Sequence, residues 1–217
     1  AVENVIVARD IMLAEETGAT LHLCHCSTKE SVELVRDAKR KGIKVSGEVC
    51  PHHFTLTEDD IVAGDANYKM NPPLRAKEDV DALKIGLRDG IMEVISTDHA
   101  PHTAEEKKKD LNHAPFGIVG TETAAALTYT ELVQKGYLDP MGMAEKMSTN
   151  PARILGIGKG DISEGHIADI VIFDPRASYE IHAKDFASKG KNTPFEGREV
   201  TGRVVTTILD GQVVYRA

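Results

Sequence analysis

The nine residues VISTDHAPH, at positions 94–102, constrain the fold of this chain more than any other stretch. The first four are rich in β-branched side chains and contain no turn former, which predicts a buried strand of a parallel sheet over residues 94–97. Asp98, His99 and His102 follow that strand directly. An acid and two histidines in this place are typical of the catalytic end of an α/β barrel. The alternative is that Asp98 only caps the next helix and that the histidines lie in an ordinary loop.

The preceding sequence alternates between helical and strand patterns with short connections. Helices are predicted over residues 1–17, 29–41 and 77–89, and strands over residues 19–26 and 43–49. A further helix is predicted over residues 121–135, after a long polar loop. This β, α, β order is the pattern of a parallel sheet with crossover helices.

After Asn150 the sequence pattern changes from alternating helices and strands to strands separated by turns. One strand is predicted over residues 169–174, ending at Pro175, and two more over 200–209 and 212–215 around the hairpin signal Asp210-Gly211. We therefore expect an α/β part at residues 1–155 and a small β module at residues 156–217.

Composition excludes several classes of function. The formal net charge of -8 argues against a nucleic-acid partner, because phosphate binding requires a basic face. No apolar run approaches the roughly 18 residues that a transmembrane helix needs, and the start does not resemble a signal peptide, so we expect no membrane association and a cytoplasmic location. Three cysteines fit reduced thiols better than a disulfide framework. The helical pattern begins at once without an initiator methionine, as if the chain were entered in the middle.

Polar side chains follow each of the three predicted strands. His25 follows the first, His52 and His53 the second, and Asp98 the third. If the strands are neighbours in a barrel, these groups meet at one rim, where imidazole and carboxylate are suitable zinc ligands. A single histidine on a strand is more often a core residue with hydrogen-bonded ring nitrogens than a metal ligand. His25, however, lies just before a helix start, at the catalytic end of its strand, which favours the ligand role.

Five motifs, in their order and spacing, resemble the C-terminal half of the bacterial type of dihydroorotase in the amidohydrolase superfamily: CHCSTKES, PHHFTLTEDD, YKMNPPLR, TDHAPH and APFGIVGTET. The stretch GDISEGHIADIVIFD is similar to the strand-turn-strand that opens the β-sandwich accessory domain of that superfamily. The resemblance covers residues 1–215. It implies an α/β fold in which residues 1–155 are the last three strands and helices of a TIM barrel and residues 156–217 are a segment of the accessory domain.

The resemblance also implies metal ligands. His25 matches the metal-binding histidine after the sixth barrel strand, and Asp98 matches the aspartate after the eighth, which in the family touches a metal and moves a proton. The complete enzyme would hold two zinc ions. His99 matches no metal ligand of the family. Cys24 and Cys26 are expected on the strand face opposite His25, so a metal site that combines all three is not expected.

Other residues match the family's substrate site. Asn71 and His102 match residues that hold the dihydroorotate ring and its carboxylate. Phe116 and Gly117 match the loop whose backbone meets the pyrimidine edge. The pair His52–His53 has no matching ligand role, and we expect it to be structural.

The first hypothesis is that this chain is part of a zinc-dependent dihydroorotase, which interconverts N-carbamoyl-L-aspartate and dihydroorotate in pyrimidine biosynthesis. The family's HxH pair, its arginine and the bridging ligand belong to earlier strands that are absent here. With one histidine and one acid, the chain cannot supply the three protein ligands of a catalytic zinc, so we expect it to be inactive without the missing N-terminal half. Its unpaired barrel edges predict self-association, for example as a homo-oligomer.

Two alternatives remain. One is a non-catalytic dihydroorotase-like scaffold for aspartate transcarbamoylase, although a scaffold would not need His25, Asn71, Asp98 and His102. The other is an allantoinase or hydantoinase, with which NPPLR is compatible, although TDHAPH followed by APFGIVGTET favours dihydroorotate.

Overall fold

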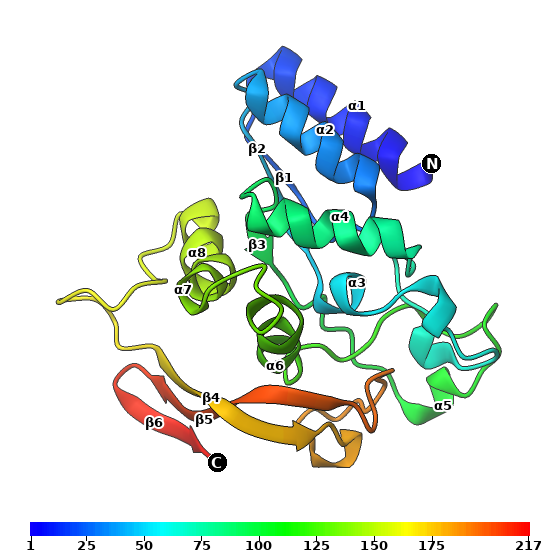
Figure 1. Cartoon of the computed structure of the whole chain (residues 1–217), viewed down its shortest axis with the longest axis vertical. Coiled ribbons are helices and arrows are strands. Elements are labelled where there is room, and N and C mark those ends of the chain that lie inside the picture. Colours follow the sequence, from blue (N-terminus) through cyan, green and yellow to red (C-terminus); the bar gives the residue numbers. More distant parts are fainter.

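The computed structural model describes the whole chain, from Ala1 to Ala217. Figure 1 shows helices gathered around a small parallel sheet and an antiparallel sheet at the opposite end of the molecule, with α6 (Ala124–Thr128) between the two sheets. None of the helices combines the length and the apolar character needed to cross a membrane.

The first part of the chain forms the parallel sheet and the helices around it. Its elements are α1 (Val2–Thr17), β1 (Leu21–Leu23), α2 (Lys29–Arg40), β2 (Val45–Val49), α3 (Pro51–Thr55), the 3-10 helices η1 (Glu58–Asp60) and η2 (Ala66–Tyr68), α4 (Lys77–Arg88), β3 (Val94–Ile95) and α5 (Ala104–Lys107). The strand order is β1-β2-β3 and both pairings are parallel. The predicted α/β arrangement of this part is confirmed.

The strands are shorter than the sequence predicts. β1 ends at Leu23 and β3 ends at Ile95, because the chain leaves the extended conformation soon afterwards, with φ of 40° at His25 and 48° at Asp98. The expected alternation of faces through residue 26 is therefore wrong: Cys24 is exposed whereas Cys26 is buried. All three cysteines are free, as predicted.

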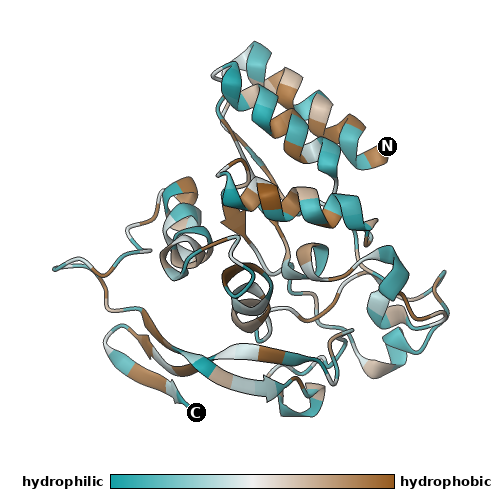
Figure 2. Ribbon diagram, viewed as in Figure 1, coloured by the Kyte–Doolittle hydropathy of each residue, from teal (hydrophilic) through white to brown (hydrophobic).

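The core of the first part forms because two helices present apolar stripes to the sheet. Thr28 begins α2 by accepting a hydrogen bond from the Ser31 amide at 3.1 Å, and Val32 and Val35 then face inward, fully buried. Leu83 and Leu87 do the same on α4. Figure 2 shows the apolar band of α4 and the apolar β3 beside it in the interior.

The predicted helix over residues 121–135 is present but changes its winding. After α6 the helix continues as the π-helical turn η3 (Tyr129–Val133). In this turn the buried Glu131 carboxylate forms ion pairs with Lys84, Lys135 and Arg198, with nitrogen–oxygen distances of 3.0, 2.6 and 2.9 Å. One acid therefore joins α4, its own helix and the segment that leads into the antiparallel sheet. Three further helices, α7 (Pro140–Ala144), η4 (Glu145–Thr149) and α8 (Asn150–Leu155), follow.

The last part is an antiparallel sheet in the order β4-β5-β6, with β4 (Ile170–Glu180), β5 (Glu199–Leu209) and β6 (Gln212–Arg216). The short 3-10 helix η5 (Ala183–Asp185) lies between β4 and β5. The predicted end of the first strand at Pro175 is wrong, because β4 continues through an irregularity between Asp174 and Ser178. A bulge leaves amides unpaired, so a proline costs the ladder little there. The Asp210-Gly211 hairpin is confirmed, with positive φ at both residues.

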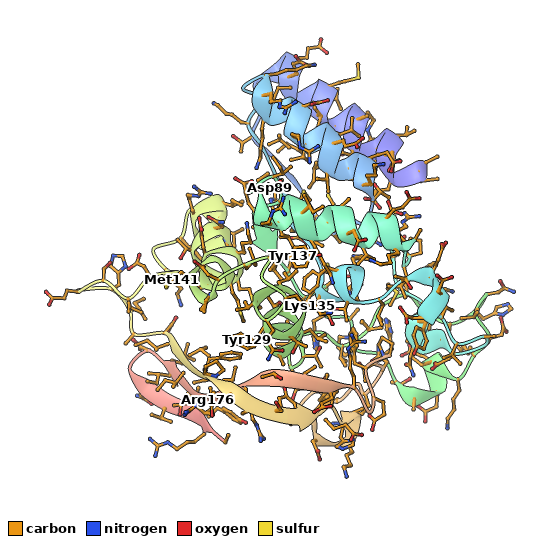
Figure 3. The ribbon with its side chains drawn as sticks, viewed as in Figure 1. Asp89, Tyr129, Lys135, Tyr137, Met141 and Arg176 are labelled. Atoms are coloured by element: carbon orange, nitrogen blue, oxygen red, sulfur yellow. The ribbon has the colours of Figure 1, made fainter.

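The antiparallel sheet packs on the helix that contains Glu131. The rings of Tyr129 and Phe173 lie 5.4 Å apart between helix and sheet, where Figure 3 labels Tyr129. A glycine is required opposite them: a Cβ at Gly202 would come within 2.3 Å of the Phe173 ring. Leu127, Phe195 and other buried residues extend this contact into a second core.

Candidate active site

His25 and Asp98 follow β1 and β3, the two strands that flank β2, and both have unusual backbone conformations. Among residues other than glycine, only these two and Asp210 in the hairpin have positive φ. Side chains in the left-handed region are strained, so such residues persist only where their surroundings hold them, and they gather at functional sites. The two residues that the sequence singles out as metal ligands are therefore the two strained residues outside a turn.

Asp98 is partly buried and interacts electrostatically with both neighbouring strand ends. Burial raises the pKa of the Asp98 carboxyl, a positive charge on His25 opposes this rise, and the negative charge of Glu48 adds to it. Because β1, β2 and β3 are parallel, His25 and Asp98 lie at the same end of the sheet, on either side of the end of β2. An imidazole and a carboxylate that converge at one sheet edge are a suitable ligand pair for a divalent metal.

Glu48, on β2, connects these strand ends, and the sequence reasoning missed it. One carboxylate oxygen accepts a hydrogen bond from the His25 amide at 3.1 Å, and the other lies 3.1 Å from Nε2 of His22. Although burial alone would raise the pKa of Glu48, the hydrogen bonds from His22 and from the His25 amide outweigh it, and the pKa is lowered. The signal was present in the sequence: an acid inside a predicted buried strand requires a partner.

Three of the predicted substrate-site residues form a second group. Nε2 of His102 hydrogen-bonds the Phe116 carbonyl oxygen at 2.9 Å, and the Phe116 side chain is 56% exposed. Gly117 is buried next to it and donates its amide to the Lys69 carbonyl oxygen at 2.9 Å. Asn71 lies two residues beyond Lys69, is exposed and makes no hydrogen bond.

Asn192 organises this second group and carries no signal in the sequence. Its side-chain oxygen accepts the His102 amide at 2.9 Å, and its side-chain amide donates to the carbonyl oxygens of Ala100 at 2.9 Å and Gly117 at 3.1 Å. It lies about ninety residues from the first of these partners, in the segment between η5 and β5. The β part of the chain therefore supports the loop after β3.

Two lysines hold the loop that contains Phe116. Nζ of Lys69 donates to the Ala114 carbonyl oxygen at 2.6 Å and lies 4.4 Å from the centre of the Phe116 ring. Nζ of Lys107 donates to the Pro115 carbonyl oxygen at 3.0 Å. Burial, together with the charge of Lys69, lowers the pKa of Lys107 to about 8.

Three further histidines, His52, His53 and His99, bond to the main chain or lie in the core. Nε2 of His53 hydrogen-bonds the Pro72 carbonyl oxygen at 2.8 Å, and His99 Nδ1 accepts the Gly120 amide at 3.1 Å. His52 is buried against the His53 ring, and burial lowers the pKa of both.

Two other groups have ligand-type atoms within 4.8 Å of one another. They are the buried set Cys50, His52 and His53, and the set His22, Cys24 and Glu48. The second set places Cys24 with residues other than His25.

The close approach of the two loops predicts a cost for adding a methyl group at Gly117. A Cβ there would come within 2.4 Å of the Ala100 Cβ, and the φ of 114° disfavours a side chain. We expect Gly117→Ala to lower the free energy of unfolding by about 2 kcal/mol, from backbone strain and overpacking together. Urea denaturation would measure it. Gly42→Ala is the matched control, since Gly42 has a φ of 79° and open space around it. Equal losses in the two variants would show that the Ala100 contact contributes nothing.

Comparison with known proteins identifies the family. The chain matches the amidohydrolase family over residues 2–214. It is 53% identical to a dihydroorotase of Pelotomaculum thermopropionicum over 212 residues, which is 98% of this chain and 50% of that protein. It is 52% identical to a dihydroorotase of Endomicrobium trichonymphae over 215 residues, 99% of this chain and 51% of that protein.

Solved structures agree on the fold. A dihydropyrimidinase from Brevibacillus agri superposes with a TM-score of 0.93 at 31% identity, over 98% of this chain and 48% of that structure. An L-hydantoinase from Arthrobacter aurescens gives a TM-score of 0.91 at 33% identity, over 98% of this chain and 48% of that structure. The chain belongs to the amidohydrolase family, and it spans about half the length of the curated relatives it matches.

Proposed function

We propose that this chain forms the C-terminal half of a dihydroorotase, a cyclic amide hydrolase of pyrimidine biosynthesis. The observation that carries the proposal is the placement of His25 and Asp98, both in the strained left-handed conformation, at the same end of two parallel strands that flank β2. Relatives named dihydroorotase, which are 52% and 53% identical to this chain over almost its whole length, support the choice of substrate.

The fold supports a division of the chain within this proposal. Residues 1–155 supply the last three strands of an eight-stranded barrel, and residues 156–217 supply part of a β-sandwich accessory domain. β1 has no partner on its outer edge, where the N-terminal half of the barrel would continue the sheet. The proposed partners are therefore that half and a small-molecule substrate.

The residues present fit a divalent metal. His25 offers a ring whose nitrogens make no hydrogen bond, and Asp98 offers a carboxylate without a hydrogen-bond donor in the chain. Zinc suits this donor set, and the remaining ligands of two ions would come from the other half of the barrel. When bound, the metal supplies Lewis-acid activation of water and of the amide carbonyl.

The chain's own residues then have distinct roles. Asp98 accepts a proton from the water that adds to the ring carbonyl and delivers it to the ring nitrogen as the carbon–nitrogen bond breaks, which yields N-carbamoyl-L-aspartate. The reverse path closes the ring. Asn71 and His102 hold the ring and its carboxylate, and the backbone at Phe116 and Gly117 meets the pyrimidine edge. The hydrogen bond from His102 to Phe116, and the Asn192 side chain that bonds both His102 and Gly117, support this grouping.

The experiment is a comparison of substrates with the complete enzyme, in which this chain is joined to an N-terminal half and loaded with zinc. We expect kcat/KM for dihydroorotate to exceed that for hydantoin, dihydrouracil and allantoin by at least about 100-fold, because a site built to bind the ring carboxylate discriminates against rings that lack it. Faster turnover of one of the other rings would reassign the substrate. No turnover of any ring, together with binding to aspartate transcarbamoylase, would favour the scaffold.

A further inference from the structure

Glu48 is the side chain that hydrogen-bonds the main chain of the proposed metal ligand His25. Its side chain is 13% exposed. One carboxylate oxygen accepts a hydrogen bond from the His25 amide, and the other accepts one from the His22 ring. The Glu48 carbonyl oxygen accepts the next amide, that of Cys26, at 2.9 Å. Two consecutive amides after β1 are therefore bound by a single residue of β2.

The His25 amide needs this acceptor because of the local conformation. β1 stops pairing with β2 at Leu23, opposite Gly47, and the chain then turns into the left-handed region at His25. An amide that leaves the ladder in a partly buried place is costly unless another acceptor replaces the lost carbonyl. Glu48 supplies that acceptor with a charged oxygen, which makes the hydrogen bond stronger than one to a carbonyl.

The Glu48 carboxylate is itself fixed in orientation. Because a carboxylate can only accept, the His22 ring donates from Nε2, and its Nδ1 is then free to accept from the Ser46 hydroxyl at 2.8 Å. Ser46 lies two residues before Glu48 on the same strand. A series of hydrogen bonds thus runs from Ser46 through His22 and Glu48 to the main chain of His25.

We propose that Glu48 is a positioning residue for the metal site: it holds the main chain of His25 in the left-handed conformation, so that the imidazole and Asp98 face the same ion. This inference rests on the proposed function. Both Glu48 oxygens already have protein donors, which distinguishes a positioning role from direct ligation. Partners that orient metal ligands in this way typically change metal affinity by 10- to 100-fold when they are removed.

The test compares Glu48→Gln with Glu93→Gln in the complete enzyme. Gln keeps an acceptor oxygen for the His25 amide but is neutral, so that hydrogen bond loses the charge that strengthens it, and the His22 ring must change its tautomer to accept from the Gln amide. Glu93 is a partly buried acid just before β3, where it pairs with Lys39 at 3.1 Å, and it controls for the loss of a carboxylate from the sheet. We expect zinc affinity, measured by competition with a chelator, to fall about 10- to 100-fold in Glu48→Gln alone, and kcat at saturating zinc to recover with KM unchanged.

Three results would overturn the proposal. They are wild-type zinc affinity in Glu48→Gln, loss of an oxygen ligand from the zinc X-ray absorption spectrum of that variant, and a wild-type protein that binds no zinc. If Glu48→Gln does not fold, hydrogen exchange on the unmodified protein tests the proposal instead. The His25 amide should exchange slowly, and fast exchange would exclude its hydrogen bond to the Glu48 carboxylate. A protein that binds zinc and loosens it in Glu48→Gln, but does not hydrolyse dihydroorotate, would keep this inference and refute the proposed function.

Discussion

Replacing Asp98 by asparagine is expected to lower kcat of the complete enzyme, in the proposed dihydroorotase reaction, by about 100- to 10,000-fold, the usual contribution of a positioned proton-transfer group. Asparagine preserves the size and shape of the side chain but cannot accept the proton of the attacking water. Asp98 lies after β3 in a strained conformation that the loop contact between His99 and Ile118 supports, so the backbone should keep its place in the variant. Steady-state kinetics with dihydroorotate at saturating zinc measures the effect.

Asp89→Asn provides the control for this change. Asp89 follows α4, and its side chain is 43% exposed and pairs with the neighbouring Arg88 (Figure 3). It precedes the start of β3 whereas Asp98 follows its end, so its loss removes a carboxylate from the opposite end of that strand. We expect kcat within about twofold of the wild type in this variant, as is usual for surface substitutions that touch no partner in the site. A kcat of Asp98→Asn equally close to the wild type would remove Asp98 from the proton-transfer role.

The periodic parts of the fold could be predicted from the sequence. Helical spacing of apolar residues identifies α2 and α4, and the Asp210-Gly211 signal identifies the β5–β6 hairpin, because these features depend on neighbours along the chain. The end of β4 could not be predicted, since a proline usually terminates a strand and only the bulge opposite β5 allows Pro175 to remain.

The candidate site divides in the same way. Polar residues after the strands point to His25 and Asp98, because strand ends are readable from local sequence. Their left-handed conformations are not readable, since neither is glycine and their contacts, such as that of Glu48 with the His25 amide, come from distant parts of the chain. Asn192 depends entirely on tertiary structure: its partners lie some 75 to 92 residues earlier in the chain.

The chain should lose stability steeply in mild acid because His53 is buried as a neutral ring. Burial lowers its pKa from 6.5 to about 4, although the hydrogen bond to the Pro72 carbonyl works in the other direction. Below pH 6.5 the unfolded chain takes up a proton at this residue that the folded chain does not bind. The free energy of unfolding therefore falls as the pH drops from about 6.5 to about 4, by about 3 kcal/mol for a shift of this size, and no further below that range.

His52 strengthens the effect. Its ring lies 4.1 Å from that of His53, and burial, with a smaller contribution from the neighbouring histidines, also lowers its pKa well below the usual value. Protonation of either ring in the folded state would place a charge in the core. For His53 the cost of burial outweighs the attraction of Glu3, so both rings oppose proton uptake. The loss between pH 6.5 and 4 should then exceed that of His53 alone.

The measurement is urea denaturation at several pH values between 7 and 4 for His53→Gln and for His113→Gln. His113 is the matched control because its side chain is 75% exposed and pairs with Asp110 on the surface. His53→Gln should be less stable than the wild type at pH 7, since it loses the packing of the ring, yet its stability should fall less as the pH is lowered. His113→Gln should retain the wild-type pH dependence. If His53→Gln shows the same slope as the wild type, the acid sensitivity of the fold comes from other groups than this buried imidazole.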